Sequence, residues 1–201
     1  MNHGAGRIGP NAIIRLAEAL RAHSGDARTE AVFAAAQLSP YLAQPPSDMV
    51  DEREVIALQS ALRAALAPAD AAQVSAHAGR LTADYLLAHR IPRLVQSLLG
   101  FLPAPVAARV LVSAIGRHAW TFAGTGEFTA VFAPTRDAPP LRFSVRHCPI
   151  CRGATASAPL CDYYAATFEH LFRTLVRSST RVTESSCEAQ GGPACAFDVR
   201  W

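Results

Sequence analysis

The sequence contains no lysine, few charged residues and no long apolar run. Arginine supplies all 19 cations, charged residues make up 17% of the 201 residues, and the formal net charge is +3. Neither a basic run nor a basic–aromatic stripe is present, so the charge pattern argues against nucleic-acid binding. No apolar stretch approaches the ~18 residues that a membrane-spanning helix requires, and we expect no transmembrane segment.

The N-terminus, MNHGAGRIGP, lacks the apolar core of a secretory signal. We therefore expect a cytoplasmic protein whose five cysteines stay reduced. In that setting cysteines are more typical of metal ligands or free thiols than of disulfides. Half of the residues are hydrophobic, which supports a sizeable core and argues against disorder.

The segment GAGRIG at residues 4–9 matches the G-x-G-x-x-G pattern of dinucleotide-binding proteins. That pattern has this meaning only when a strand precedes it and a helix packs behind it. Only three residues precede Gly4, so we expect no such strand and interpret the segment as a flexible terminus. The sequence then shows no nicotinamide-binding fingerprint.

The order of sequence patterns predicts an α+β fold with an antiparallel sheet and a packed helix. Apolar residues recur at helical spacing over residues 11–23, 47–66, 68–90, 92–102 and 103–120. Strand-like alternation follows at 127–133 and 141–147, then an aromatic helix at 161–177 and two short strands at 180–187 and 195–201. We divide the chain into a helical N-terminal extension, residues 1–70, and a domain that contains the sheet, residues 71–201.

The spacing of the cysteines is typical of metal ligands. Cys148 and Cys151 form a C-x-x-C pair, and Cys187 and Cys195 flank a Gly-Gly-Pro turn. A tetrahedral zinc needs four donors, and two sets are possible. One set combines Cys148 and Cys151 with two of the later cysteines. The other set consists of Cys161, Glu184, Cys187 and Cys195. For any single cysteine, a buried inert thiol is the alternative.

The segment PLCDYYAATFEHLF…TRVTESSCEAQGGPACAFDV resembles the C-terminal half of the 4-vinyl reductase domain family, which is similar to haem-NO-binding domains. In that family a helix headed by cysteine precedes a strand, an E-x-x-C motif and a further cysteine. Sensor domains with this pattern hold a structural zinc. The resemblance carries the zinc ligands onto Cys161, Glu184, Cys187 and Cys195. It leaves Cys148 and Cys151 outside the site, and it implies a homodimer.

Further upstream, YLLAHRIPRLVQSLLGFLPAPVAARVLVSAIGRHAWTFAGTGEF is similar to the family members of bacteriochlorophyll synthesis. This similarity implies three hypotheses: a protein that binds or carries a tetrapyrrole such as divinyl protochlorophyllide, an 8-vinyl reductase, or a small-molecule sensor or scaffold module. Reduction needs a hydride or electron source, and a zinc with four protein ligands carries no electrons. We therefore favour a non-catalytic carrier, with enzymes of bacteriochlorophyll synthesis as partners.

A flat magnesium tetrapyrrole needs an apolar slot with aromatic walls and a few polar anchors. His118, Trp120 and Phe122 would share one face if RHAWTF were extended, and His118 would be the axial ligand. His77 and His89 are further candidates for that role, and Arg90 or Arg93 would meet a propionate. The predicted pigment-binding residues are Tyr85, His89, Arg90, His118, Trp120 and Phe122. The alternative for each histidine is a satisfied position in or near the core.

Overall fold

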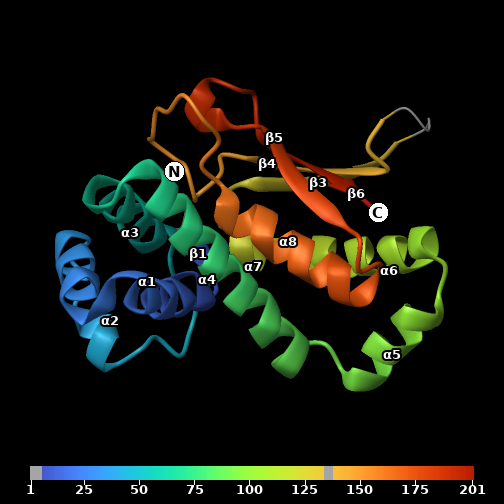
Figure 1. The fold of residues 1–201 in the computed structure, drawn as a ribbon, viewed down its shortest axis with the longest axis horizontal. Coiled ribbons are helices and arrows are strands. Elements are labelled where there is room, and N and C mark those ends of the chain that lie inside the picture. Colours follow the sequence, from blue (N-terminus) through green and yellow to red (C-terminus); the bar gives the residue numbers. More distant parts are fainter. Residues whose placement is uncertain (1–5, 134–137) are drawn as a thin grey trace.

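The computed structural model describes residues 6–133 and 138–201, in which helices cover one face of a four-stranded sheet (Figure 1). The helices are α1 (Asn11–Ala35), α2 (Pro40–Ala43), α3 (Glu52–Ala65), α4 (Pro68–His89), α5 (Arg93–Phe101), α6 (Ala104–Arg117), α7 (Trp120–Ala123) and α8 (Asp162–Leu175). The strands are β1 (Arg7–Ile8), β2 (Val50–Asp51), β3 (Glu127–Phe132), β4 (Leu141–Arg146), β5 (Arg181–Ser186) and β6 (Cys195–Arg200). A 3-10 turn, η1, spans Glu188–Gln190.

The sheet has the order β3-β4-β6-β5, and all neighbouring strands are antiparallel. Side chains of β4 alternate as the sequence predicts, with Leu141, Phe143 and Val145 buried and Arg142 exposed. Arg142 pairs with Asp198 on β6 across the exposed side. The α+β prediction and both predicted hairpins are confirmed. Part of the predicted connection between β3 and β4, residues 134–137, lies outside the described residues.

Helix α8 lies between the sheet and α4 and forms the centre of the core (Figure 1). Its buried face carries Tyr164, Phe168 and Phe172 at a spacing of four residues, which places them in one row along the helix. Phe168 packs on Phe143 of β4 with ring centroids 4.7 Å apart. The hydrophobic core extends from this row to side chains of α1 and α3. The division of the chain near residue 70 stays a prediction.

Four local predictions differ from the structure. The helix predicted over residues 47–66 begins only at Glu52, because residues 50 and 51 form β2 and Asp51 caps the helix. The helix predicted over residues 11–23 continues to Ala35 after a break at Gly25, whose φ is 77°. Residues 118–122 are not extended, because the chain turns after α6 and forms α7. Of the GAGRIG segment, residues 6–9 are not a free terminus, since β1 pairs with β2; residues 4 and 5 lie outside the described residues. Among the helices of the described chain, none has the length and apolar character needed to cross a membrane.

The helices α4 and α8 approach each other closely at Gly79. A Cβ atom on Gly79 would lie 2.3 Å from the backbone oxygen of Tyr163, so only glycine fits without movement. The hydroxyl of Thr167 donates a hydrogen bond of 3.0 Å to the Gly79 oxygen. Next to this point, the Thr82 and Tyr163 hydroxyl groups are hydrogen-bonded at 2.8 Å.

We expect Gly79→Ala to lower the free energy of unfolding by about 1–3 kcal/mol, because the added methyl group forces α4 and α8 apart. Gly100→Ala is the matched control. It places the same methyl on exposed α5 with no atom within 4 Å, and should raise stability by up to about 1 kcal/mol. Urea unfolding of both variants measures the difference. Equal stability of the two variants would contradict the close contact.

Candidate metal centre

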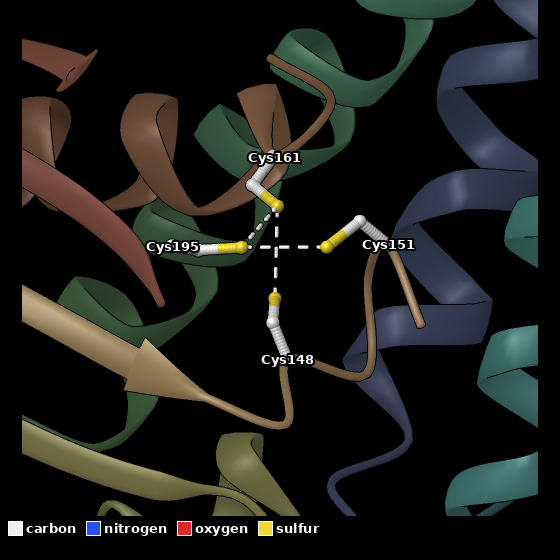
Figure 2. A group of neighbouring side chains, drawn as sticks. All are labelled: Cys148, Cys151, Cys161 and Cys195. Atoms are coloured by element: carbon white, nitrogen blue, oxygen red, sulfur yellow. Dashed lines mark hydrogen bonds between the residues drawn. The ribbon is translucent and has the colours of Figure 1, made fainter. Parts of the chain in front are cut away.

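Five buried sulfur atoms meet where the loop after β4, the start of α8 and the turn between β5 and β6 come together. Cys148 and Cys151 come from the loop, Cys161 precedes α8, and Cys187 and Cys195 flank the turn. None of the five residues is more than 1% exposed. Figure 2 shows Cys148, Cys151, Cys161 and Cys195 pointing toward one centre.

The spacing of the sulfur atoms fits a tetrahedral metal site. The Sγ–Sγ distances are 3.6 Å for Cys148–Cys161, 3.5 Å for Cys161–Cys195, 3.3 Å for Cys151–Cys195 and 3.8 Å for Cys187–Cys195. Four sulfur ligands at the zinc–sulfur bond length of about 2.3 Å lie about 3.8 Å from one another. Disulfide bonds need about 2.05 Å, so these residues are free thiols arranged as ligands.

The cluster contains two overlapping sets of four donors, and within each set the ligand atoms all lie within 4.8 Å of one another. The first set is Cys148, Cys151, Cys161 and Cys195. The second set, which the family resemblance implies, is Cys161, Glu184, Cys187 and Cys195. The resemblance leaves Cys148 and Cys151 outside the site, but the loop after β4 brings both beside it, with Cys148 Sγ 3.6 Å from Cys161 Sγ. Which set holds an ion stays a prediction. Both sets derived from spacing are therefore geometrically available.

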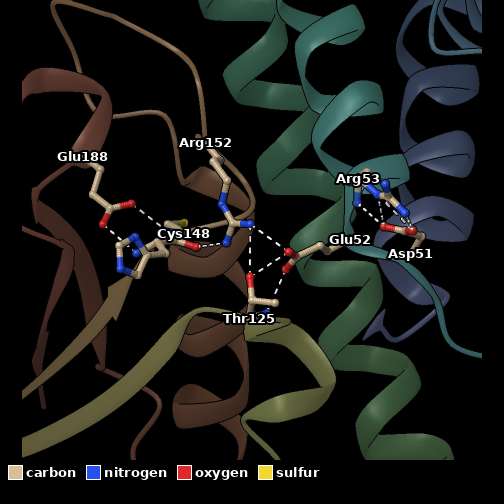
Figure 3. Close-up of polar contacts among 8 residues, drawn as sticks. Asp51, Glu52, Arg53, Thr125, Cys148, Arg152 and Glu188 are labelled. Atoms are coloured by element: carbon tan, nitrogen blue, oxygen red, sulfur yellow. Dashed lines mark hydrogen bonds and ion pairs between the residues drawn. The ribbon is translucent and has the colours of Figure 1, made fainter. Parts of the chain in front are cut away.

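The C-x-x-C loop is fixed in place by charged side chains from other elements. The Glu188 carboxylate accepts hydrogen bonds from the backbone N–H groups of His147, at 2.7 Å, and Cys148, at 2.8 Å (Figure 3). The Arg63 guanidinium of α3 donates to the Ile150 oxygen at 2.9 Å. Burial lowers the pKa of Arg63, while the nearby thiols act in the opposite direction. A guanidinium keeps its proton under these conditions, so Arg63 supplies positive charge beside the sulfur atoms.

A buried carboxylate, Glu52, connects α3 to the same loop (Figure 3). Its oxygens accept hydrogen bonds from the Thr125 N–H at 2.8 Å, the Thr125 hydroxyl at 2.7 Å and Arg152 at 2.9 Å. Arg152 follows Cys151 directly and also donates to the His147 oxygen. Burial acts to raise the pKa of Glu52, but the hydrogen bonds from Thr125 and Arg152 outweigh it, so the pKa is lowered.

Glycines provide the room for the Glu52 carboxylate. A Cβ atom on Gly6 would lie 2.6 Å from Glu52 Cδ, and one on Gly124 would lie 2.3 Å from Glu52 Oε2. Gly124 also has a φ of 60°, which side-chain-bearing residues rarely adopt. Gly6 therefore belongs to a carboxylate pocket and not to a phosphate-binding loop.

Glu184 supplies the only carboxylate of the two donor sets. Its Oε2 accepts a hydrogen bond of 2.8 Å from the Cys161 N–H, and its Oε1 is buried with no hydrogen-bond partner among the described residues. Burial raises the pKa of Glu184 to about 8. Hydrogen bonds to the neighbouring sulfur atoms, first to Cys148, and then burial raise the pKa of Cys161, because both favour the protonated thiol. A cation would satisfy both the orphan oxygen and the thiolates.

The predicted pigment-binding residues fall into two groups that share no hydrogen bond or ring contact in the described chain. Tyr85, His89 and Arg90 lie at the end of α4, where Tyr85 and His89 stack with ring centroids 4.6 Å apart. Trp120 is 61% exposed, whereas Phe122 turns into the core against Phe128. His118, Trp120 and Phe122 do not share one face, because the helical turn of α7 separates side chains that an extended strand would align.

Sequence reasoning missed four residues that organise the metal centre: Glu52, Arg63, Arg152 and Glu188. Arg152 and Glu188 each follow a cysteine in the sequence, and that adjacency is a signal that a search for supporting residues could use. Glu52 and Arg63 carry no such signal, since each lies about 90–100 residues before the part of the loop that it contacts. Only the folded chain brings them to the site.

We expect Glu52→Gln to lower the free energy of unfolding by about 1.5–3 kcal/mol at neutral pH, because a neutral amide cannot accept the same charge-assisted hydrogen bonds. The folded-state pKa of Glu52 is below its ordinary value of 4.5, so this contribution is present above pH 4.5 and is lost as the pH falls through the folded-state value. The wild-type advantage over Glu52→Gln should therefore shrink in acid, as urea unfolding at several pH values would measure. The exposed carboxylate variant Asp48→Asn is the control, and a Glu52→Gln effect no larger than that of Asp48→Asn would contradict this role.

Comparison with known proteins agrees with the sequence resemblance. The family model of the 4-vinyl reductase domain matches residues 141–201. The chain is 42% identical over 195 residues to the Bacteriochlorophyll synthase 23 kDa chain of Cereibacter sphaeroides, which covers 97% of this chain and 91% of that protein. It is 37% identical over 191 residues to the protein of the same name from Rhodobacter capsulatus, with 95% and 85% covered. The chain belongs to the family of the bacteriochlorophyll synthase 23 kDa chain, with a 4-vinyl reductase domain at its C-terminal end.

Proposed function

We propose that this protein takes part in bacteriochlorophyll biosynthesis by binding a magnesium tetrapyrrole intermediate and carrying it between enzymes of the pathway. The name that the two relatives share, Bacteriochlorophyll synthase 23 kDa chain, supports the pathway. An exposed, apolar and basic surface on α5 and α6 supports the ligand. The thiol cluster supports a structural metal, for which zinc is the ion that its donors suit best.

The proposed tetrapyrrole-binding surface is the α5–α6 face. Its members are Leu94, Val95, Leu98, Phe101, Leu102, Val106 and Val110. Leu94, Leu98 and Phe101 are 72%, 57% and 88% exposed and share one side of α5 at helical spacing. In α5, only Leu99 is buried. Contiguous exposed apolar side chains of this kind mark a binding surface.

The charge around the α5–α6 face selects an anionic ligand. Residues 85–126 contain no aspartate or glutamate but include Arg90, Arg93, Arg109 and Arg117. Among the described residues, no carboxylate lies within ion-pair distance of these four arginines. A tetrapyrrole combines a broad apolar ring with carboxylate side chains, which arginine recognises by charge-assisted hydrogen bonds. The face therefore matches both parts of that ligand.

The same charge argues against pairing of two copies through this face. In a symmetric dimer the same patch meets itself, so arginines would face arginines. We keep the homodimer as a proposal and expect its interface on other helices. Light scattering on the wild-type protein at micromolar concentration tests the dimer, and a monomer would contradict it.

His89 is the best-placed axial ligand for a magnesium ion. Its Nδ1 lies 3.1 Å from the Tyr85 backbone oxygen, which can only accept, so Nδ1 carries the hydrogen. This leaves the Nε2 lone pair free, and the stack on Tyr85 orients the ring. His89 is exposed and ends α4, directly before α5. We therefore assign the axial role to His89 and not to His118. His118 and the exposed Trp120, at the far end of α6, would flank the ligand.

We expect the purified protein to bind magnesium protoporphyrin with micromolar affinity or better and to shift its Soret band. Phe101→Asp should weaken binding at least about tenfold, because it removes apolar contact and places a carboxylate beside the anionic ligand. Val131→Asp is the matched control, since Val131 is 62% exposed and points to the opposite side of β3 from Phe132, which Arg109 of α6 contacts. Equal affinity of the two variants would contradict binding at the α5–α6 face, and absence of any pigment binding would overturn the carrier proposal.

The axial role of His89 has a separate test. His89→Ala should reduce the Soret shift with magnesium protoporphyrin and leave binding of metal-free protoporphyrin unchanged, whereas His23→Ala on α1 should alter neither.

Incubation of bound divinyl protochlorophyllide with reduced nicotinamide should leave the 8-vinyl group intact. Formation of the 8-ethyl product by the purified protein would favour the reductase hypothesis over the carrier.

A further inference from the structure

The two donor sets of the thiol cluster share one edge. Cys161 and Cys195 belong to both sets, and their sulfur atoms are 3.5 Å apart. Cys148 and Cys151 complete one tetrahedron, and Glu184 and Cys187 complete the other. The cluster therefore offers six donors, which is the number that two tetrahedral ions need when they share two bridging ligands.

A single ion would leave two donors of the cluster without a partner. If the ion used the four-thiol set, Cys187 and the orphan Glu184 Oε1 would remain buried beside it. If the ion used the set with Glu184, Cys148 and Cys151 would remain as thiols that are 0% and 1% exposed. The Glu184 oxygen is the costly one, because a buried polar atom without a partner lowers stability, and more so beside charge. Either single-ion arrangement thus leaves two buried donors of the cluster unused, and a second ion would bind them.

We infer that the cluster binds two divalent metal ions, zinc by its donor chemistry, with Cys161 and Cys195 as bridging thiolates. Cys148 and Cys151 are the terminal ligands of one ion, and Glu184 Oε1 and Cys187 are the terminal ligands of the other. The two-ion site rests on the structural metal of the proposed function and is independent of pigment binding.

The charge of the donors and the hydrogen bonds that hold them in place agree with two bound ions. Two divalent cations offset four of the six negative charges of the ionised donors, and the partly buried guanidinium of Arg63 donates a hydrogen bond to the C-x-x-C loop. Each pair of terminal ligands has its own support. Glu188 holds the Cys148 backbone, and the Cys161 N–H holds the second oxygen of Glu184. Such supporting contacts orient ligands before the metal arrives.

The stoichiometry of the wild-type protein tests the inference without any variant. We expect two zinc ions per chain by elemental analysis and by native mass spectrometry of protein purified with a thiol reductant. X-ray absorption should show a zinc–zinc vector of about 3 Å, from the shared edge of 3.5 Å and a bond length of about 2.3 Å. One zinc per chain would overturn the two-ion site but keep the structural zinc. No zinc, or iron with inorganic sulfide, would overturn both and leave pigment binding to its own assay.

Variants assign the two ions to their ligands. Cys151→Ala and Cys187→Ala should each lower the zinc content from two ions to one, because each removes a terminal ligand of a different ion. Cys195→Ala removes a bridge and should lose both ions, while Ser186→Ala beside the cluster should keep two. Retention of two ions in either terminal variant would contradict the assignment. The wild-type stoichiometry and the absorption measurement decide the question if a variant fails to fold.

Discussion

The convergence of five buried sulfur atoms constrains the arrangement of three chain segments. The loop after β4, the start of α8 and the β5–β6 turn meet at these atoms and at the hydrogen bonds around them. Closely spaced thiolates repel one another, so the arrangement is favourable only when positive charge offsets theirs. Binding of the proposed metal would therefore be coupled to folding of this end of the molecule.

The supporting contacts extend this coupling to the N-terminal helices. Glu52 and Arg63 of α3 both reach the C-x-x-C loop, one through Arg152 and the other through the Ile150 oxygen. Gly6 and Gly124 contribute empty space, without which the Glu52 carboxylate could not enter. The first 70 residues thus help to build the metal centre, which agrees with the full-length similarity to the relatives.

The proposed pigment surface lies at the other end of the molecule. Figure 1 shows α5 away from α1–α3 and from the start of α8, where the cysteines gather. A buried thiol cluster at one end and an exposed apolar surface at the other give the two parts different physical character. Exposed leucine and phenylalanine side chains carry a solubility cost that a bound apolar ligand would relieve. Residues 85–126 contain four arginines and no aspartate or glutamate, which is the charge that an anionic ligand would require.

The sequence by itself determined the element types, both hairpins, the apolar row of α8 and the donors available for metal. These features depend on periods of two and 3.6 residues and on short spacings, which neighbouring residues specify. The tertiary structure alone decided that Cys148 and Cys151 join the later cysteines, that Glu52 supports them, and that residues 120–123 form a helix. Those outcomes depend on the path of loops and on the space left by Gly6 and Gly124. Contacts between segments about 100 residues apart leave no periodic trace in the sequence, because they arise only when the whole core packs.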